Sequence, residues 1–121
     1  MTKDVMTKYM LAIYGSTQVW DAMDKAAWDR LGAAHGTLIG ELRATGEFLE
    51  TNELDVESAK IVRTANGETL VTDGPFVESR EILGGYYLID VVDEARAIQI
   101  AAQLVEAEFA PIEVRRVLDH E

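Results

Sequence analysis

Two stretches of the sequence are apolar on both alternating sets of positions, and they constrain the fold more than any other feature. In residues 9–14 every side chain is aliphatic, aromatic or methionine, and residues 86–91 follow the same pattern apart from one aspartate. Successive side chains of a strand point to opposite faces of its sheet, so strands of this kind are covered on both faces. We expect both stretches to be central strands.

Helical and hairpin signals lie between these two strands. Residues 21–44 predict a helix that ends at Gly46, and residues 47–54 predict a short strand. The segments AKIVRT and TLVT flank Asn66-Gly67, a pair typical of a two-residue hairpin turn. The apolar stripe of the helix consists of Trp28, Leu31, His35, Leu38 and Leu42.

After the second central strand the sequence predicts one more helix and one more strand. The helix runs over residues 93–107 with Asp93 as its N-cap, and Pro111 separates it from the strand IEVRRVL. The order β-α-β-β-(β)-α-β indicates an α+β fold of the ferredoxin-like, split βαβ type, with an antiparallel sheet and two helices on one face. A single domain over residues 8–118 is expected, with loose termini at 1–7 and 119–121.

Two helices cover only one face of such a sheet, yet both central strands are apolar on two faces. Exposed apolar surface costs about 25 cal/mol per Å². We therefore expect a homodimer that packs through the open sheet face, a dimeric α/β barrel, with a cavity near the seam that could hold a small-molecule ligand.

Composition excludes several classes of function. The chain has no cysteine, and its formal net charge of −11 disfavours nucleic acids and anionic lipids as partners. No apolar run is long enough to span a membrane and the first residues do not resemble a signal peptide, so a cytoplasmic location is expected. Neither a phosphate-binding loop nor a metal-ligand spacing is present, and we expect no cofactor and no metal.

The segment TDGPFVESREILGGYY carries the most ionisable chemistry. Asp73 either caps a turn through backbone N–H groups or presents a carboxylate at the mouth of the cavity. In the second case Phe76 forms an apolar wall, while Arg80, Glu81 and Tyr86 could contact a ligand.

His35 is the second functional candidate, because it lies on the apolar stripe of the first helix between Leu31 and Leu38. It is either a buried histidine with one hydrogen bond or a general acid or base, since imidazole titrates near neutral pH. Asp73 is its expected carboxylate partner. His120 lies in an acidic tail and is not expected to have a specific role.

These features together resemble the DGPF-motif branch of the YCII-related proteins. The likeness spans nearly the whole chain and includes YMLAIYG, LIGELRATGEF and the run DGPF followed by VESREILGGYY. It implies a ferredoxin-like, dimeric α/β barrel. In the wider group a helix histidine and an aspartate are proposed as an active-site pair, and His35 falls on the histidine position. The group's aspartate belongs to a motif after the second helix, where this chain reads EAEFAPIEV, so a dyad would take its carboxylate from Asp73.

Two hypotheses for function follow. The first is a small cofactor-independent enzyme of lyase, dehydrochlorinase or isomerase type, in which His35 and Asp73 transfer a proton. The second is a dimer that binds a small ligand or regulates another protein without catalysis, because the DGPF branch tends to be associated with extracytoplasmic-function sigma factors.

Overall fold

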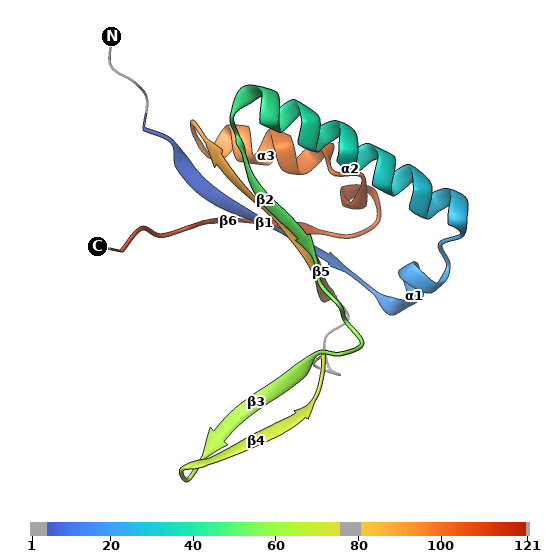
Figure 1. The fold of residues 1–121 in the computed structure, drawn as a ribbon, viewed down its shortest axis with the longest axis vertical. Coiled ribbons are helices and arrows are strands. Elements are labelled where there is room, and N and C mark those ends of the chain that lie inside the picture. The colour runs from blue at the N-terminus through green and yellow to red at the C-terminus, as the bar shows by residue number, and fades with distance from the viewer. Residues whose placement is uncertain (1–4, 76–80, 121) are drawn as a thin grey trace.

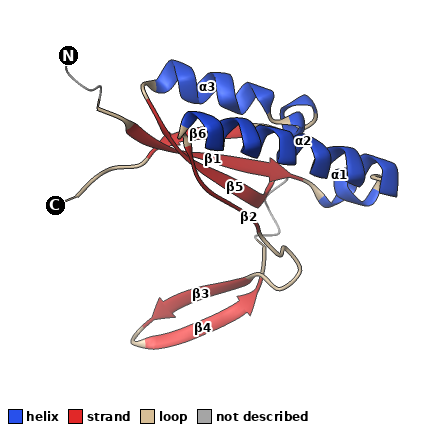
Figure 2. Ribbon diagram, turned by 45° about the horizontal axis from the view of Figure 1, so that its top comes forward, coloured by secondary structure: helices blue, strands red, loops and turns tan. Residues whose placement is uncertain are grey.

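A computed structural model describes residues 5–75 and 81–120 of the chain. It contains a four-stranded antiparallel sheet in the order β2-β5-β1-β6, formed by Phe48–Glu53, Ile82–Val91, Thr7–Gly15 and Ile112–Arg116. The two stretches that are apolar on both faces, now β1 and β5, are the central pair. Helices α2 (Lys25–Thr45) and α3 (Glu94–Gln103) lie on the same face of the sheet (Figure 2). The expected ferredoxin-like α+β fold is confirmed.

Local signals of the sequence determine several element boundaries. The side chain of Asp93 accepts a hydrogen bond from the backbone N–H of Arg96 and caps α3. Gly46 ends α2 with φ of 79°, a left-handed conformation that glycine adopts without steric cost. Asn66 and Gly67 both have positive φ and join β3 (Lys60–Ala65) to β4 (Glu68–Asp73), as predicted.

The first predicted helix is divided in two. A short helix α1 (Thr17–Asp21) follows β1, and α2 begins only at Lys25, where Asp24 accepts a hydrogen bond from the backbone N–H of Ala27. The helix expected from residue 21 therefore starts four residues later. The last helix is shorter than predicted, because α3 ends at Gln103 and a 3-10 turn, η1 (Val105–Glu108), follows it.

The hydrophobic core lies between the sheet and the C-terminal half of α2 together with α3. Leu38 and Leu42 are buried, whereas Trp28 on the same stripe is 41% exposed. Figure 1 shows why: the N-terminal half of α2 continues past α3 toward α1. The buried core cluster comprises Tyr9, Leu11, Leu38, Leu42, Tyr87, Ile89, Val91, Ala97, Ile100, Ala101 and Leu104.

The opposite face of the sheet has no helix over it among the described residues (Figure 2). The register of β1 and β5 pairs Met10 with Leu88 and Ala12 with Tyr86 on this face. No helix within the described ranges is both long and apolar enough to cross a membrane.

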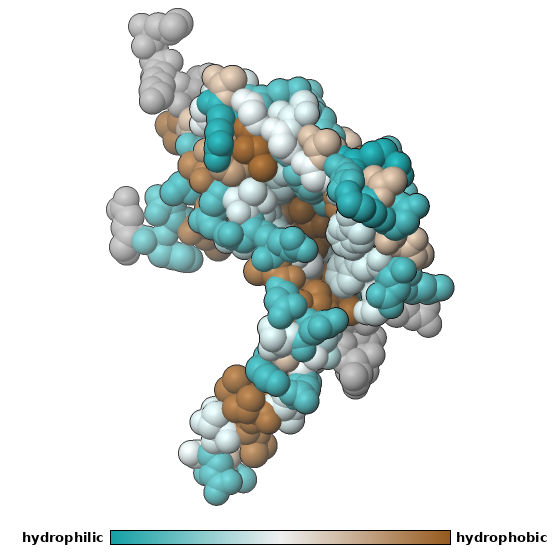
Figure 3. Space-filling model, turned by 45° about the vertical axis from the view of Figure 1, so that its right-hand side comes forward, coloured by the Kyte–Doolittle hydropathy of each residue, from teal (hydrophilic) through white to brown (hydrophobic). Residues whose placement is uncertain are grey.

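The hairpin β3–β4 forms a separate two-stranded sheet that projects from the rest of the fold (Figure 1). Apolar side chains gather on it (Figure 3), and Val62, Leu70 and Val71 are all more than half exposed. Along the chain, the DGPF run thus begins at the end of β4 on this exposed hairpin, and β5 of the main sheet is the next strand after it.

Candidate functional site

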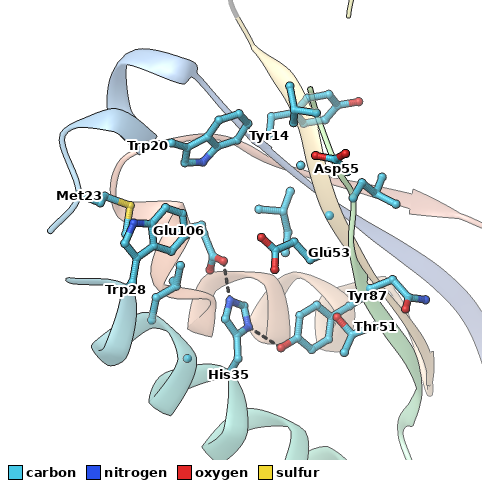
Figure 4. A pocket seen from close by; sticks show the side chains of 18 of the residues that line it. Tyr14, Trp20, Met23, Trp28, His35, Thr51, Glu53, Asp55, Tyr87 and Glu106 are labelled. Atoms are coloured by element: carbon cyan, nitrogen blue, oxygen red, sulfur yellow. Dashed lines mark hydrogen bonds and ion pairs between the residues drawn. The ribbon is translucent and has the colours of Figure 1, made fainter. Parts of the chain in front are cut away.

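A cavity of about 800 Å³ opens where the N-terminal half of α2 extends beyond the core. Its walls come from α1, α2, the ends of β1 and β5, and the segment that follows β2 (Figure 4). A volume of this size is within the range of sites that bind small molecules. The apolar stripe of α2 therefore builds a cavity wall at its N-terminal end, with Trp28, Leu31 and His35 on it.

Trp20 of α1 forms a second aromatic wall of the cavity, and two glycines make room for it. A Cβ atom on Gly15 would lie 2.5 Å from the indole ring, and one on Gly84 would lie 3.0 Å from it. A contact as short as the one at Gly15 does not occur, so that position requires glycine while Trp20 stays in place, whereas a side chain at position 84 would require the indole ring to shift by a few tenths of an ångström. The register of β1 against β5 also shifts between Ile13 and Tyr14, next to this pair.

His35 lies in the wall of the cavity, and each of its ring nitrogens has a partner. Nδ1 is 2.5 Å from the hydroxyl oxygen of Tyr87, and Nε2 is 2.5 Å from Oε2 of Glu106 (Figure 4). The His35 and Tyr87 rings also stack, with centroids 5.6 Å apart. The three residues come from α2, β5 and η1, so the tertiary fold brings them together.

The partners define the tautomer of His35. A carboxylate accepts hydrogen bonds, so Nε2 carries a proton and donates it to Glu106. Burial and the negative charge of Glu106 raise the pKa of Tyr87 from its ordinary value of 10.0 to about 12, so the phenol keeps its proton at neutral pH. In the neutral form of the His35 imidazole, Nδ1 is then the acceptor nitrogen and the Tyr87 hydroxyl donates to it.

Glu106 is the most unusual member of this group, because it is a carboxylate that is only 8% exposed. Its Oε2 atom contacts His35, whereas Oε1 is buried and has no hydrogen-bond partner among the described residues. An unpaired buried carboxylate oxygen is costly.

The structure does not bring together His35 and Asp73, the expected catalytic pair. Asp73 is at the end of β4 on the projecting hairpin, where its side chain is 87% exposed and Oδ1 lies 2.5 Å from Nζ of Lys60. The carboxylate beside His35 is Glu106 instead.

The expected ligand-binding residues lie elsewhere or outside the described ranges. Tyr86 points to the open face of the sheet, where its hydroxyl donates to Glu50 at 2.6 Å and accepts from Asn52 at 2.9 Å. Glu81 is exposed and is not part of the cavity wall. Phe76 and Arg80 lie outside the described residues. Within the described ranges, no three potential metal ligands lie close enough together to hold an ion.

Sequence reasoning missed Glu106 and the hydroxyl of Tyr87. A signal for Glu106 was available, since the resemblance placed a carboxylate after the second helix and the chain has EAEF there. Glutamate supplies the same functional group as aspartate on a longer side chain. For Tyr87 the sequence predicted only the face of the sheet on which the side chain lies. The partner of its hydroxyl, His35, is 52 residues away along the chain and could not be derived from local spacing.

Comparison with known proteins identifies one curated relative and one family for this chain. The chain is 44% identical over 50 residues to an uncharacterized protein of Rhizobium meliloti (strain 1021), a stretch that covers 41% of this chain and 40% of the relative. The chain thus matches less than half the length of that relative. The sequence description of the YCII-related domain matches residues 7–121, which include every element of the sheet and both long helices. The chain therefore belongs to the YCII-related family.

Proposed function

We propose that this chain is a small cofactor-independent enzyme of lyase or isomerase type, in which His35 transfers a proton to or from a small organic molecule. The observation that carries the proposal is the arrangement Glu106–His35–Tyr87 in the wall of a cavity of about 800 Å³. A histidine held by a carboxylate on one nitrogen is a common form of general base. Glu106 has the orienting role that was expected of Asp73.

Nδ1 is the nitrogen that exchanges the proton. Its bond to Tyr87 joins two neutral groups, whereas the bond from Nε2 to Glu106 is charge-assisted and about twice as strong. The Tyr87 bond is therefore the one that opens when a substrate enters. When Nδ1 takes a proton from the substrate, Glu106 stabilises the imidazolium that forms, and the same proton can return to another substrate atom. Such a transfer serves an isomerisation or an elimination, and it consumes no oxidant or cofactor.

The alternative is a dimer that binds a small ligand or has a regulatory role without catalysis, with a link to extracytoplasmic-function sigma factors through the resemblance to the DGPF branch. One observation favours it: both nitrogens of His35 already have partners, so neither is free in the absence of a ligand. In that case the cavity selects a ligand and the His35 hydrogen bonds only fix its wall.

Exchange of substrate protons with D₂O separates these alternatives without knowledge of the net reaction. Small molecules with an acidic C–H bond are incubated with the protein in D₂O, and proton NMR follows the loss of the C–H signal. We expect exchange by the wild type, a loss of about 100-fold or more in His35→Gln, and full activity in His120→Gln, which alters the exposed second histidine. Exchange that survives in His35→Gln would contradict the proposal, and binding without any exchange would favour the alternative.

Nitrogen NMR of the imidazole tests the role of Glu106 separately. We expect His35 in the wild type to be held in the tautomer with the proton on Nε2, and His120 to show the average of an exposed ring. Glu106→Gln should release this tautomer while circular dichroism shows an intact fold. An unchanged His35 spectrum in that variant would mean that Glu106 does not position the ring.

We also propose that the chain forms a homodimer through the open face of the sheet. Support comes from the half-buried apolar residues Met10, Tyr86 and Leu88, which form the centre of that face around the small Ala12. A second copy would cover this surface by packing sheet against sheet.

A further inference from the structure

The walls of the cavity carry negative charge and no balancing positive charge among the described residues. Carboxylates line it at five positions, Asp21, Glu53, Asp55, Glu57 and Glu106, and no lysine or arginine is among the described lining residues. Four of the five are at the exposed mouth, whereas Glu106 is buried deeper, beside His35. An anion that enters meets only like charges, and their repulsion is weakly screened where water is excluded.

Two aromatic rings lie across the cavity from Glu53 and Asp55 (Figure 4). Trp20, Trp28 and Met23 line it (Figure 4), and Phe109 is a further lining residue. Trp20 and Trp28 are the only two tryptophans in the chain. An indole face attracts cations through its quadrupole and also packs well against apolar groups, so this wall suits an apolar body that carries a positive charge.

The buried oxygen Oε1 of Glu106 is an independent indication of a donor ligand. Within the described ranges it has no hydrogen-bond partner, although the residue is only 8% exposed and lines the cavity. An ammonium group has three N–H donors and no acceptor, which is the complement of an unpaired carboxylate oxygen. A carboxylate or phosphate ligand would instead leave Oε1 unpaired and add a repulsion.

We propose that the molecule bound in this cavity is an organic amine in its cationic form, with an aromatic or branched aliphatic body. The ammonium group is held by Glu53 at the mouth, the negative charge of Glu106 lies deeper in the cavity, and the apolar body lies against Trp20 and Trp28. The proposal names the substrate class of the site described above and to that extent rests on the proposed function. Binding, however, can be measured without catalysis.

Tryptophan fluorescence provides a direct measurement, because both tryptophans of the chain are in the cavity wall. The wild type is titrated with three compounds of similar shape: 2-phenylethylamine, 2-phenylethanol and 3-phenylpropionate, which are cationic, neutral and anionic at pH 7. We expect the amine to bind about 10-fold or more tightly than the other two, and its affinity to fall at high ionic strength. Trp20→Phe and Trp28→Phe assign the signal.

Two variants of β2 distinguish the effect of a cavity carboxylate on amine binding from the effect of the overall negative charge of the protein. Glu53 lines the cavity, whereas Glu50 lies three residues earlier on the open face and contacts Tyr86. Glu53→Gln should weaken binding of the amine about 5-fold and leave the alcohol unchanged, and Glu50→Gln should affect neither.

The inference is overturned if the alcohol or the propionate binds as tightly as the amine, if none of the three compounds binds, or if Glu50→Gln weakens the amine as much as Glu53→Gln. These outcomes are distinguishable from failure of the proposed function. Amine binding without proton exchange would leave the substrate class standing and remove the catalysis. Proton exchange with neutral compounds alone would support the catalysis and remove the amine as the substrate class.

Discussion

Tyr87 connects the hydrophobic core to the candidate site, and its ionisation should be visible in the stability of the protein. The residue is 1% exposed, and burial together with the charge of Glu106 raises its pKa from 10.0 to about 12. Because the fold favours the protonated phenol, the associated stability is fully present below pH 10 and is lost as the pH rises from 10 to about 12.

We therefore expect wild type and Tyr87→Phe to differ in their alkaline behaviour. The free energy of unfolding, measured with urea at a series of pH values, should fall by about 2 kcal/mol more in the wild type than in Tyr87→Phe between pH 9 and pH 12. Absorbance of tyrosinate at 295 nm should show one late-titrating group that the variant lacks. Parallel stability curves for the two proteins would contradict the assignment.

At the scale of single residues, the sequence predicted where a functional side chain lies on its element better than it predicted which residues that side chain contacts. His35 was found because an ionisable side chain stood on an apolar helical stripe, which depends only on local spacing. Its carboxylate partner could not be derived in this way, since Glu106 is 71 residues distant and is brought near by the packing of η1 against α2. Asp73 had the right chemistry, but it lies on a hairpin whose direction depends on the whole fold.

At the scale of elements, Glu47 links three parts of the fold. It stands between the end of α2 and the start of β2, and its carboxylate accepts two hydrogen bonds of 2.8 Å from Arg96 of α3. Its backbone N–H donates to Leu42, and its carbonyl accepts from Asp90 of β5. The Arg96 guanidinium is the main reason that the pKa of Glu47 lies below its ordinary value of 4.5, although burial acts in the opposite direction.

Loss of this pair should reduce stability in a pH-dependent manner. The contribution of a carboxylate with a lowered pKa is fully present above 4.5 and is lost as the pH falls through the lower, folded-state value. We expect Glu47→Gln to lower the free energy of unfolding by about 2 kcal/mol at pH 7, and the difference from wild type to shrink below pH 4.5.

The matched control is Asp29→Asn, which also removes one carboxylate from an ion pair. Asp29 and its partner Lys25 have side chains that are 64% and 88% exposed, so the cost should stay below about 1 kcal/mol. Chemical denaturation at pH 7 and pH 4 compares the two variants directly. Equal losses in both would mean that the pair between Glu47 and Arg96 behaves as a surface ion pair.

The elements that were predictable are those with local signals. Asp93, Gly46 and the Asn66-Gly67 turn each specify a boundary through their own backbone or side-chain chemistry, and all three predictions are confirmed. Helix α1 is only five residues long and offers no periodicity to detect. It is also the element that carries Trp20, so an important cavity wall was not visible in the sequence.

At the scale of the whole molecule, the central strands β1 and β5 are apolar on both faces, and this pattern predicts a second subunit over the face that the helices leave open. The described part of the chain covers one face with α2 and α3, and the other face keeps a half-buried apolar centre made of Met10, Tyr86 and Leu88. Glu50 and Asn52 on one edge strand and Glu113 on the other flank this centre with polar groups. An apolar centre with a polar rim is the usual composition of an interface between subunits.

We expect the wild type to sediment as a dimer at micromolar concentration and Leu88→Lys to sediment as a monomer, because a buried unpaired ammonium at the centre of the interface is costly. Ile98→Lys is the matched control: Ile98 is 52% exposed on α3, on the helical side of the molecule, and its replacement should leave the dimer intact. Sedimentation velocity measures both, and circular dichroism verifies the fold. A monomeric wild type would refute the dimer, and dissociation by Ile98→Lys alone would move the interface from the sheet to the helices.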